Sequence, residues 1–240
     1  MIKLLEKDKL PSVNFTDGFS MTKIKANLWS YGNKYPFLNV WQQTVDNTIA
    51  ALISKFEDTL VLAANSSADL FEIKEFTNVI GYKSLQGEPW ILKEMNIPFK
   101  EYEILMKKWQ GAESLLPIPK IEKIYKILYS EENEGIKPTE FEGFYVDLSH
   151  RIRHGTAAAL NLENSAVCIA SHITNKHAVI SGVFTIKNER EKGKGSKALD
   201  YLVKALGERD IFVAAEDKVS PFYLKNGFTP CGKNAIYENE

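Results

Sequence analysis

The stretch from Gly182 to Ser196 combines residue types that bind anions. Gly193 and Gly195 lie one residue apart, and four basic residues surround them: Arg190, Lys192, Lys194 and Lys197. Glycines let the backbone approach a ligand closely, and the first free N–H groups of a helix attract negative charge. This combination predicts an anion-binding loop, and a diphosphate is the ligand that we expect.

The residues on either side of this loop predict the elements that hold it. Ala178 to Ile186 is apolar and rich in β-branched residues, which is typical of a buried strand. After the loop, apolar residues recur at helical spacing and predict a helix that begins near Gly193: Ala198, Leu199, Leu202, Val203 and Leu206. The loop is therefore expected to join a strand to a helix.

Two other phosphate-binding motifs fit this loop less well. Gly193-x-Gly195-x-x-Ala198 matches the dinucleotide fingerprint, with Glu216 as its ribose-binding acid. In that fold, however, the first glycine follows the strand directly and further βαβ units come later. Here the charged run Lys187–Lys192 intervenes, and little chain remains after Glu216. The nucleoside triphosphate loop, Gly-x-x-x-x-Gly-Lys-Ser/Thr, cannot be aligned with these residues.

Composition and charge exclude several classes of protein. The 240 residues are 44% hydrophobic and 25% charged, as in an ordinary globular protein. The formal net charge of −1 gives no general attraction to nucleic acid or membrane, so we expect neither as a partner. No apolar run reaches the roughly 18 residues that span a bilayer, and residues 1–9 lack the apolar core of a signal peptide. Cys168 and Cys231 lack metal-ligand spacing, so we expect free thiols, no metal site and a cytoplasmic protein.

The first half of the chain is predicted to be a meander of strands followed by alternating helices and strands. Residues 1–36 show no clear period. The later pattern predicts these elements in order: strands Leu38–Val45, Thr48–Phe56 and Thr59–Ala64, a helix from Leu70 with Asp69 as its N-cap and Gly81 as its stop, a strand Tyr82–Gln86, a short helix Trp90–Met95 and a strand Phe99–Lys107.

The second half repeats this order of elements. Gln110 to Pro119, with one glycine and two prolines, predicts a boundary, and we place the domains at 1–112 and 113–240. The predicted elements are helices from Ile121 and from Thr139 to His154, strands Thr156–Leu162, Ala166–Thr174 and Ala178–Ile186, the loop and its helix, a strand Ile211–Ala215, a short helix Phe222–Asn226 and a final strand to Tyr237. We infer a degenerate duplication with one competent site, because the first copy has only Asn65-Ser66-Ser67 in place of the glycine-rich loop.

Two segments of the second half resemble motifs of one family. Gly182 to Leu199 resembles the coenzyme A loop of the GNAT acetyltransferases, whose core is Arg/Gln-x-x-Gly-x-Gly/Ala between a strand and a helix, here Arg190 to Gly195. Ser220-Pro-Phe-Tyr-Leu-Lys-Asn-Gly-Phe228 resembles the late motif of the same superfamily. The resemblance covers the chain well from about residue 118 to 240, and the first half resembles the degenerate N-terminal domain of two-domain members.

The resemblance implies a fold, a cofactor and a site. The fold is that of acyl-CoA N-acyltransferases: an α/β (α+β) architecture with a mixed, mostly antiparallel central sheet flanked by helices, present twice. The cofactor is acetyl-CoA, bound through Val183, Phe184, Thr185, Arg190, Glu191, Lys192, Gly193, Lys194, Gly195 and Ser196. Tyr223 is the implied catalytic residue, a general acid that protonates the leaving thiolate. The sequence departs from the family pattern at Glu191, where glycine is usual, and at Glu216-Asp217, where many members carry an asparagine that contacts the cofactor.

Spacing does not identify the general base that accepts the proton of the amine. The candidates are His150, His154, His172 and Glu216. The segment Arg151–His154 is either a binding surface for an acidic acceptor or a solvated helix end. Cys168 is expected in the core, since no partner motif for a nucleophile accompanies it.

Together these features predict an acetyl-CoA-dependent N-acetyltransferase that moves an acetyl group directly to a primary amine. A small-molecule amine is favoured over a protein lysine as acceptor, because the sequence contains no partner-binding module. Two alternatives stay open: an acyl-CoA-binding regulatory protein without turnover, and an N-acyltransferase that uses longer acyl donors. No motif specifies the acceptor or the oligomeric state.

Overall fold

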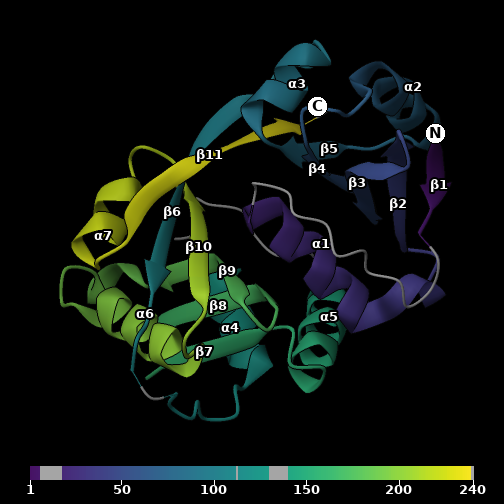
Figure 1. Cartoon of the computed structure of the whole chain (residues 1–240). Helices are drawn as coiled ribbons and strands as arrows, with labels where there is room; N and C mark the ends of the chain where they lie inside the picture. Colours follow the sequence, from purple (N-terminus) through teal and green to yellow (C-terminus); the bar gives the residue numbers. More distant parts are fainter. Residues whose placement is uncertain (6–17, 112, 130–139, 239–240) are drawn as a thin grey trace. The chain divides into compact units, whose positions relative to one another are not determined.

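The computed structural model describes residues 1–5, 18–111, 113–129 and 140–238, and Figure 1 labels its elements. Before residue 112 these are β1 (Ile2–Leu4), α1 (Gly18–Tyr31), the 3-10 helix η1 (Gly32–Lys34), β2 (Leu38–Val45), β3 (Thr48–Phe56), β4 (Thr59–Ala64), α2 (Leu70–Ile80), β5 (Ser84–Gly87), α3 (Pro89–Glu94) and β6 (Lys100–Lys108). After residue 112 they are α4 (Ile121–Leu128), α5 (Phe141–Arg153), β7 (Ala158–Leu162), β8 (Ala166–Ile173), β9 (His177–Thr185), the 3-10 helix η2 (Lys187–Glu189), α6 (Lys194–Ala205), β10 (Asp210–Ala215), α7 (Ser220–Lys225) and β11 (Thr229–Glu238).

The chain divides into two compact units, and neither is contiguous in sequence. The first unit consists of Met1–Ile104, Ala214–Ser220 and Pro230–Glu240, and the second of Leu105–Val213 and Pro221–Thr229. Most of β11 therefore belongs to the first unit, although it follows the second half in sequence. The domain boundary between residues 112 and 113 stays a prediction.

In the first unit the strands follow one another in the order β1-β2-β3-β4-β5-β11-β6. The predicted antiparallel meander is confirmed residue for residue in β2, β3 and β4, and the turn residues Asp46 and Asn47 have positive φ values of 47° and 61°. β5 runs parallel to β4. On its other side β5 pairs antiparallel with β11, where Ala235 lies opposite Gly87.

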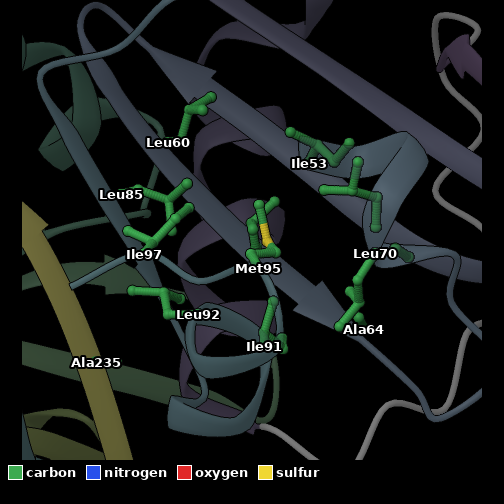
Figure 2. Packing of buried hydrophobic residues seen from close by; sticks show 13 residues of the cluster. Ile53, Leu60, Ala64, Leu70, Leu85, Ile91, Leu92, Met95, Ile97 and Ala235 are labelled. Atoms are coloured by element: carbon green, nitrogen blue, oxygen red, sulfur yellow. The ribbon is translucent and has the colours of Figure 1, made fainter. Parts of the chain in front are cut away.

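One apolar core cluster of the first unit contains side chains from the sheet, α2 and α3, and another contains side chains from the sheet and α1. Figure 2 shows the side chains of the first of these clusters gathered together, among them Ile53, Leu85 and Met95. Helix α2 has one apolar face: Leu70 and Ile73 are buried in this cluster, and Phe76 and Ile80 pack against it. Burial of such a face is what stabilises a helix of this length in a globular protein.

β6 is divided between the units at Ile104 and Leu105, and in the second unit the strand order is β6-β10-β9-β8-β7. β7, β8 and β9 form an antiparallel meander, and β10 runs parallel to β9. The predicted apolar face of α6 is confirmed, because the five residues that form this face are buried: Ala198, Leu199, Leu202, Val203 and Leu206. Each unit therefore contains a meander of three strands, a helix, and a further strand parallel to the third, as the predicted repeat requires.

Helix α1 lies where the sequence shows no clear period. Polar residues on it are buried along with apolar ones: Ser20, Thr22, Asn27 and Ser30. The predicted start of the later helix at Thr139 lies outside the described residues, and α5 begins at Phe141. Among the described residues, no helix is both long enough and apolar enough to cross a lipid bilayer.

Candidate functional site

Strand β9 presents part of one edge without a strand partner. Its pairing with β8 continues to Thr185, whereas its pairing with β10 ends at Ile180, opposite Val213. Among the described strands, residues 182–185 therefore pair only on the β8 side. Residues 183–185 are half-buried, and backbone N–H and C=O groups on an unpaired edge can form a ladder of hydrogen bonds with an extended ligand.

The loop after β9 leads to a helix N-terminus that lacks a side-chain cap. Gly193 is the N-cap residue of α6, in the left-handed conformation with φ 77°, and no side chain accepts a hydrogen bond there. The first backbone hydrogen bond of α6 runs from the Lys197 N–H to the Gly193 carbonyl. The N–H groups of Lys194, Gly195 and Ser196 consequently have no acceptor within the helix. Together with the helix dipole they favour an anion at this point.

The two glycines of the loop are required for different reasons. Gly193 has a backbone conformation that favours glycine, although a Cβ there would meet open space. At Gly195, a Cβ would lie 2.9 Å from Thr185 Oγ1 and 3.6 Å from the Phe222 ring. Gly195 is thus where the end of β9, the start of α6 and Phe222 of α7 come together. Glu191, which departs from the family pattern, also has a positive φ of 64°, a conformation that glycine adopts with less strain.

Two of the basic residues around the glycines face carboxylates. The Nζ atom of Lys192 lies 3.5 Å from a carboxylate oxygen of Glu189. The Nζ atom of Lys194 lies 2.9 Å from the other oxygen of Glu189 and 3.5 Å from a carboxylate oxygen of Glu163. The hydrogen bond from Lys194 lowers the pKa of Glu189, and the same bond raises the pKa of Lys194. The sequence predicts a basic cluster, and the structure differs because the turn between β7 and β8 brings Glu163 to the loop. The net positive charge of the loop is smaller than its lysines indicate.

Arg190 is bound to the end of β9. Its Nε donates a hydrogen bond to the Thr185 carbonyl at 3.1 Å, and its guanidinium lies 5.6 Å from the centre of the Phe184 ring. A guanidinium carries five N–H donors, so it can hold the strand end and bind an anion at the same time. The predicted cofactor-binding residues from Val183 to Ser196 therefore surround one corner, formed by the strand end, the loop and the helix start.

Tyr223 lies on α7 in an aromatic environment. It is 6% exposed, and its ring lies 5.1 Å from that of Phe222 and 5.5 Å from that of Phe228, both edge to face. Burial raises the pKa of the Tyr223 phenol, and the nearby Cys168 thiol raises it further. The phenol is therefore protonated at neutral pH, and its hydroxyl can donate a hydrogen bond.

The candidate bases are each engaged by other groups. The rings of His150 and His154 lie 4.3 Å apart at the end of α5, and His172 Nδ1 lies 2.7 Å from the Ser171 hydroxyl. Glu216 lies 2.7 Å from Lys100 and 3.1 Å from Lys218, and hydrogen bonds from these lysines lower its pKa. A carboxylate stabilised in this way is a weaker base, so Glu216 is the least favourable of the four candidates.

The structure also shows the burial of three other residues that the sequence analysis names. Arg151 is buried and bound to Asp147 at 2.8 Å, so it is not part of a solvated helix end. Cys168 is buried as expected, and burial raises the pKa of its thiol. Cys231, by contrast, is exposed on β11.

Sequence reasoning missed Glu189 and Glu163, which bind the loop lysines. Glu189 has a local signal, since it lies three residues before Lys192 and an acid at this spacing is a common ion-pair partner. Glu163 has none, because its turn is distant from Lys194 in sequence.

Similarity to solved structures covers the whole chain. A tandem GNAT protein from the clavulanic acid biosynthesis pathway aligns with 99% of this chain and 98% of its own, at 10% identity and a TM-score of 0.57. A GNAT-family acetyltransferase from Colwellia psychrerythraea aligns over 100% of both chains, at 12% identity and a TM-score of 0.51. A GCN5-related N-acetyltransferase from Sphaerobacter thermophilus aligns over 91% of both, at 12% identity and a TM-score of 0.55. This chain has the GNAT acetyltransferase fold.

The GNAT fold accounts for both halves of the sequence. No protein-family model and no curated protein sequence matches the chain, so the fold is established by structure. It confirms the predicted architecture, a mixed and mostly antiparallel sheet flanked by helices, and a tandem GNAT protein matches across nearly the full length. The corner around Gly195 lies in the second copy of this GNAT fold.

Proposed function

We propose that the chain is an acetyl-CoA-dependent N-acetyltransferase that moves an acetyl group directly to a primary amine of a small molecule. One observation carries this proposal: the unpaired edge of β9, the uncapped start of α6 and Phe222, the neighbour of Tyr223 on α7, meet at Gly195. A strand edge, a helix N-terminus and a buried phenol can hold an amide chain, a diphosphate and a leaving sulfur respectively. The GNAT fold of the whole chain supports the same reaction class.

The residues of this corner fit coenzyme A. The N–H groups of Lys194, Gly195 and Ser196 have no acceptor in the helix, and Arg190 adds guanidinium donors, so these residues would hold the diphosphate. Thr185 and Phe222 leave no room for a Cβ on Gly195, so the glycine lets the start of α6 lie directly against the end of β9. The amides of the pantetheine arm would pair with the free edge of residues 182–185.

The side chains and backbone of the second unit then have distinct tasks. When bound, acetyl-CoA supplies the acetyl group as a thioester, and the amine nitrogen bonds to the acetyl carbon as the C–S bond breaks and the nitrogen loses a proton. Backbone N–H groups on the β9 edge polarise the acetyl carbonyl. Tyr223 donates a hydrogen bond to the departing sulfur.

The raised pKa of Tyr223 bears on whether it donates a proton or only a hydrogen bond to the leaving sulfur. Thiols have a pKa of about 8.5 and phenols of about 10, and burial raises that of Tyr223 above its ordinary value. The phenol is thus a weaker acid than the thiol that leaves. We therefore expect Tyr223 to stabilise the thiolate mainly as a hydrogen-bond donor, with the proton itself delivered from solvent or along this bond.

Thiol release from acyl-CoA tests the proposal directly. The full chain is mixed with acetyl-CoA and a panel of small primary amines, and free thiol is measured; binding of acetyl-CoA is measured separately by calorimetry. We expect amine-dependent thiol release, faster with acetyl-CoA than with propionyl- or hexanoyl-CoA. Faster release with the longer donors would identify a longer-chain N-acyltransferase. Binding without release for any amine would favour a regulatory protein, and the absence of binding would refute the proposal.

A further inference from the structure

The first unit contains a cleft that the proposed acyl transfer does not use. It has a volume of about 330 Å³ and lies where β6 begins and β11 ends, lined by Phe99, Lys100, Tyr102, Tyr237 and Glu238 among others. All of these residues belong to the first unit. The volume is at the lower end of the roughly 300–1,000 Å³ that ligand pockets span, so a ligand here must be small.

The aromatic walls of this cleft are held in place by packing. Phe99 and Tyr237 pack against the apolar cluster of the first unit, shown in part in Figure 2. Tyr237 also meets Tyr82 edge to face, with the ring centres 6.0 Å apart. Rings that are fixed before a ligand arrives lose little conformational freedom on binding. The cleft thus offers a preformed aromatic surface.

The charges in the cleft favour a cationic ligand. Lys100, the only basic residue of the lining, is bound to Glu216 at 2.7 Å and lies 5.1 Å from the centre of the Tyr102 ring. An anionic ligand would have to compete with Glu216 for this lysine. Glu238, by contrast, has no ion-pair partner among the described residues. The cleft therefore presents one uncompensated carboxylate beside aromatic rings, and ring faces attract ammonium groups.

We propose that the cleft between the start of β6 and the end of β11 binds a small organic ammonium ion with an apolar body. The ammonium group pairs with Glu238, and the apolar body packs on Phe99 and Tyr237. The site is independent of the acyl-transfer site, because none of its residues belongs to the corner around Gly195.

Three probes of similar shape and different charge test this site in the full chain by NMR titration. They are phenethylammonium, 2-phenylethanol and 3-phenylpropionate. We expect phenethylammonium to bind with a Kd on the order of 1 mM, the alcohol several-fold more weakly, and the carboxylate most weakly. Equal binding of the three probes, tighter binding of the carboxylate, or no binding of the amine would overturn the proposal.

Matched variants locate the binding. Glu238→Gln should weaken phenethylammonium binding by about three- to fivefold and bring it close to that of the alcohol, whereas Glu75→Gln, an exposed carboxylate on α2, should change nothing. Tyr237→Phe keeps the ring and should leave the affinity within about twofold. Gly195→Val alters the corner in the second unit and should leave phenethylammonium binding intact. If Gly195→Val removes the binding and Glu238→Gln does not, the amine binds at the acyl-transfer site instead and the cleft is not a ligand site.

Discussion

Helices α2 and α6 hold corresponding positions in the two copies of the fold, but their N-termini are completed in opposite ways. At α2, the Asp69 carboxylate accepts a hydrogen bond from the Glu72 N–H at 3.0 Å. The backbone of Asp69 is itself held by Gln43, which is buried. At α6, Gly193 provides no cap. The first copy caps its helix with its own carboxylate, whereas the second has no side-chain acceptor at the same position.

The strands before these helices, β4 and β9, differ in how far their unpaired ends are buried. β4 stops pairing with β5 after Val61, as β9 stops pairing with β10 after Ile180. In the first copy, however, residues 62–64 are at most 2% exposed, and a Cβ on Gly87 would lie 3.4 Å from both Leu62 and Leu92. The corresponding edge of β9 is half-buried. The first copy has closed its strand edge with side chains, and an extended ligand has no place there.

The short helices α3 and α7 have similar sequences, and α7 carries the proposed catalytic residue, Tyr223. Both contain the pattern Pro-aromatic-x-Leu-Lys, in Pro89–Lys93 and in Pro221–Lys225. This alignment places Ile91 at the position of Tyr223, and both side chains are buried. The first copy therefore has the same apolar packing at this position without the hydroxyl. In cap, strand edge and hydroxyl, only the second copy has the features that the proposed function requires.

Removing the Tyr223 hydroxyl is expected to have the largest effect. In Tyr223→Phe and in Tyr223→Ile, which introduces the residue of the first copy, kcat should fall about 100-fold while acetyl-CoA affinity is unchanged. Tyr201→Phe, an exposed tyrosine on α6, is the control. Since the pKa of Tyr223 lies above its usual value of about 10, its ionisation should not reduce the rate of the unmodified enzyme below pH 10. An unchanged kcat in Tyr223→Phe would assign Tyr223 to packing alone.

Filling the space at Gly195 is expected to have the next largest effect. The side chain of Gly195→Val would press on Thr185 and Phe222, and overpacking of this kind costs roughly 1–3 kcal/mol. Acetyl-CoA affinity, measured by calorimetry, should fall about 10- to 100-fold. Gly232→Val is the matched control, because a Cβ on Gly232 meets nothing within 4 Å. Equal affinity in the two variants would show that the cofactor does not approach this corner.

An acid at the start of α6 should make the second copy resemble the first. Gly193→Asp places a carboxylate where Asp69 stands in α2, and Gly193→Asn has the same shape without the charge. Both residues tolerate a positive φ, so their difference isolates electrostatics. Gly193→Asp should bind acetyl-CoA about five- to tenfold more weakly than Gly193→Asn, and the ratio should shrink at high salt. A ratio of one at low salt would place the diphosphate elsewhere.

Features encoded within a few residues were predictable from the sequence. The cap at Asp69, the apolar face of α6 and the turn at Asp46 and Asn47 each depend on neighbours at fixed spacing. The glycines of the loop were predictable for the same reason, since their conformational freedom and lack of a side chain are properties of the residue itself.

Features that depend on distant residues were not predictable. Helix α1 buries polar residues as well as apolar ones because the rest of the first unit covers it, so its sequence shows no amphipathic period. The ion pair between Glu163 and Lys194 and the pairing of β11 with β5 join segments far apart in sequence. Only the folded chain brings such partners together.

Removing the cap of α2 is expected to have the smallest effect on function. It tests whether the Asp69 carboxylate alone keeps the first copy from binding acetyl-CoA. Asp69→Ala should lower the free energy of unfolding by about 1 kcal/mol, since a lost N-cap costs roughly 0.5–2 kcal/mol, and Asp69→Asn, which retains an acceptor, should lower it less; urea titration measures both. Acetyl-CoA should still bind with a stoichiometry of one per chain. The uncapped end of α2 does not become a second site, because Glu72 stays beside it, bound to Gln43 at 2.8 Å, and the edge of β4 stays closed. A stoichiometry of two in Asp69→Ala would mean that the carboxylate alone keeps the first copy from binding the cofactor.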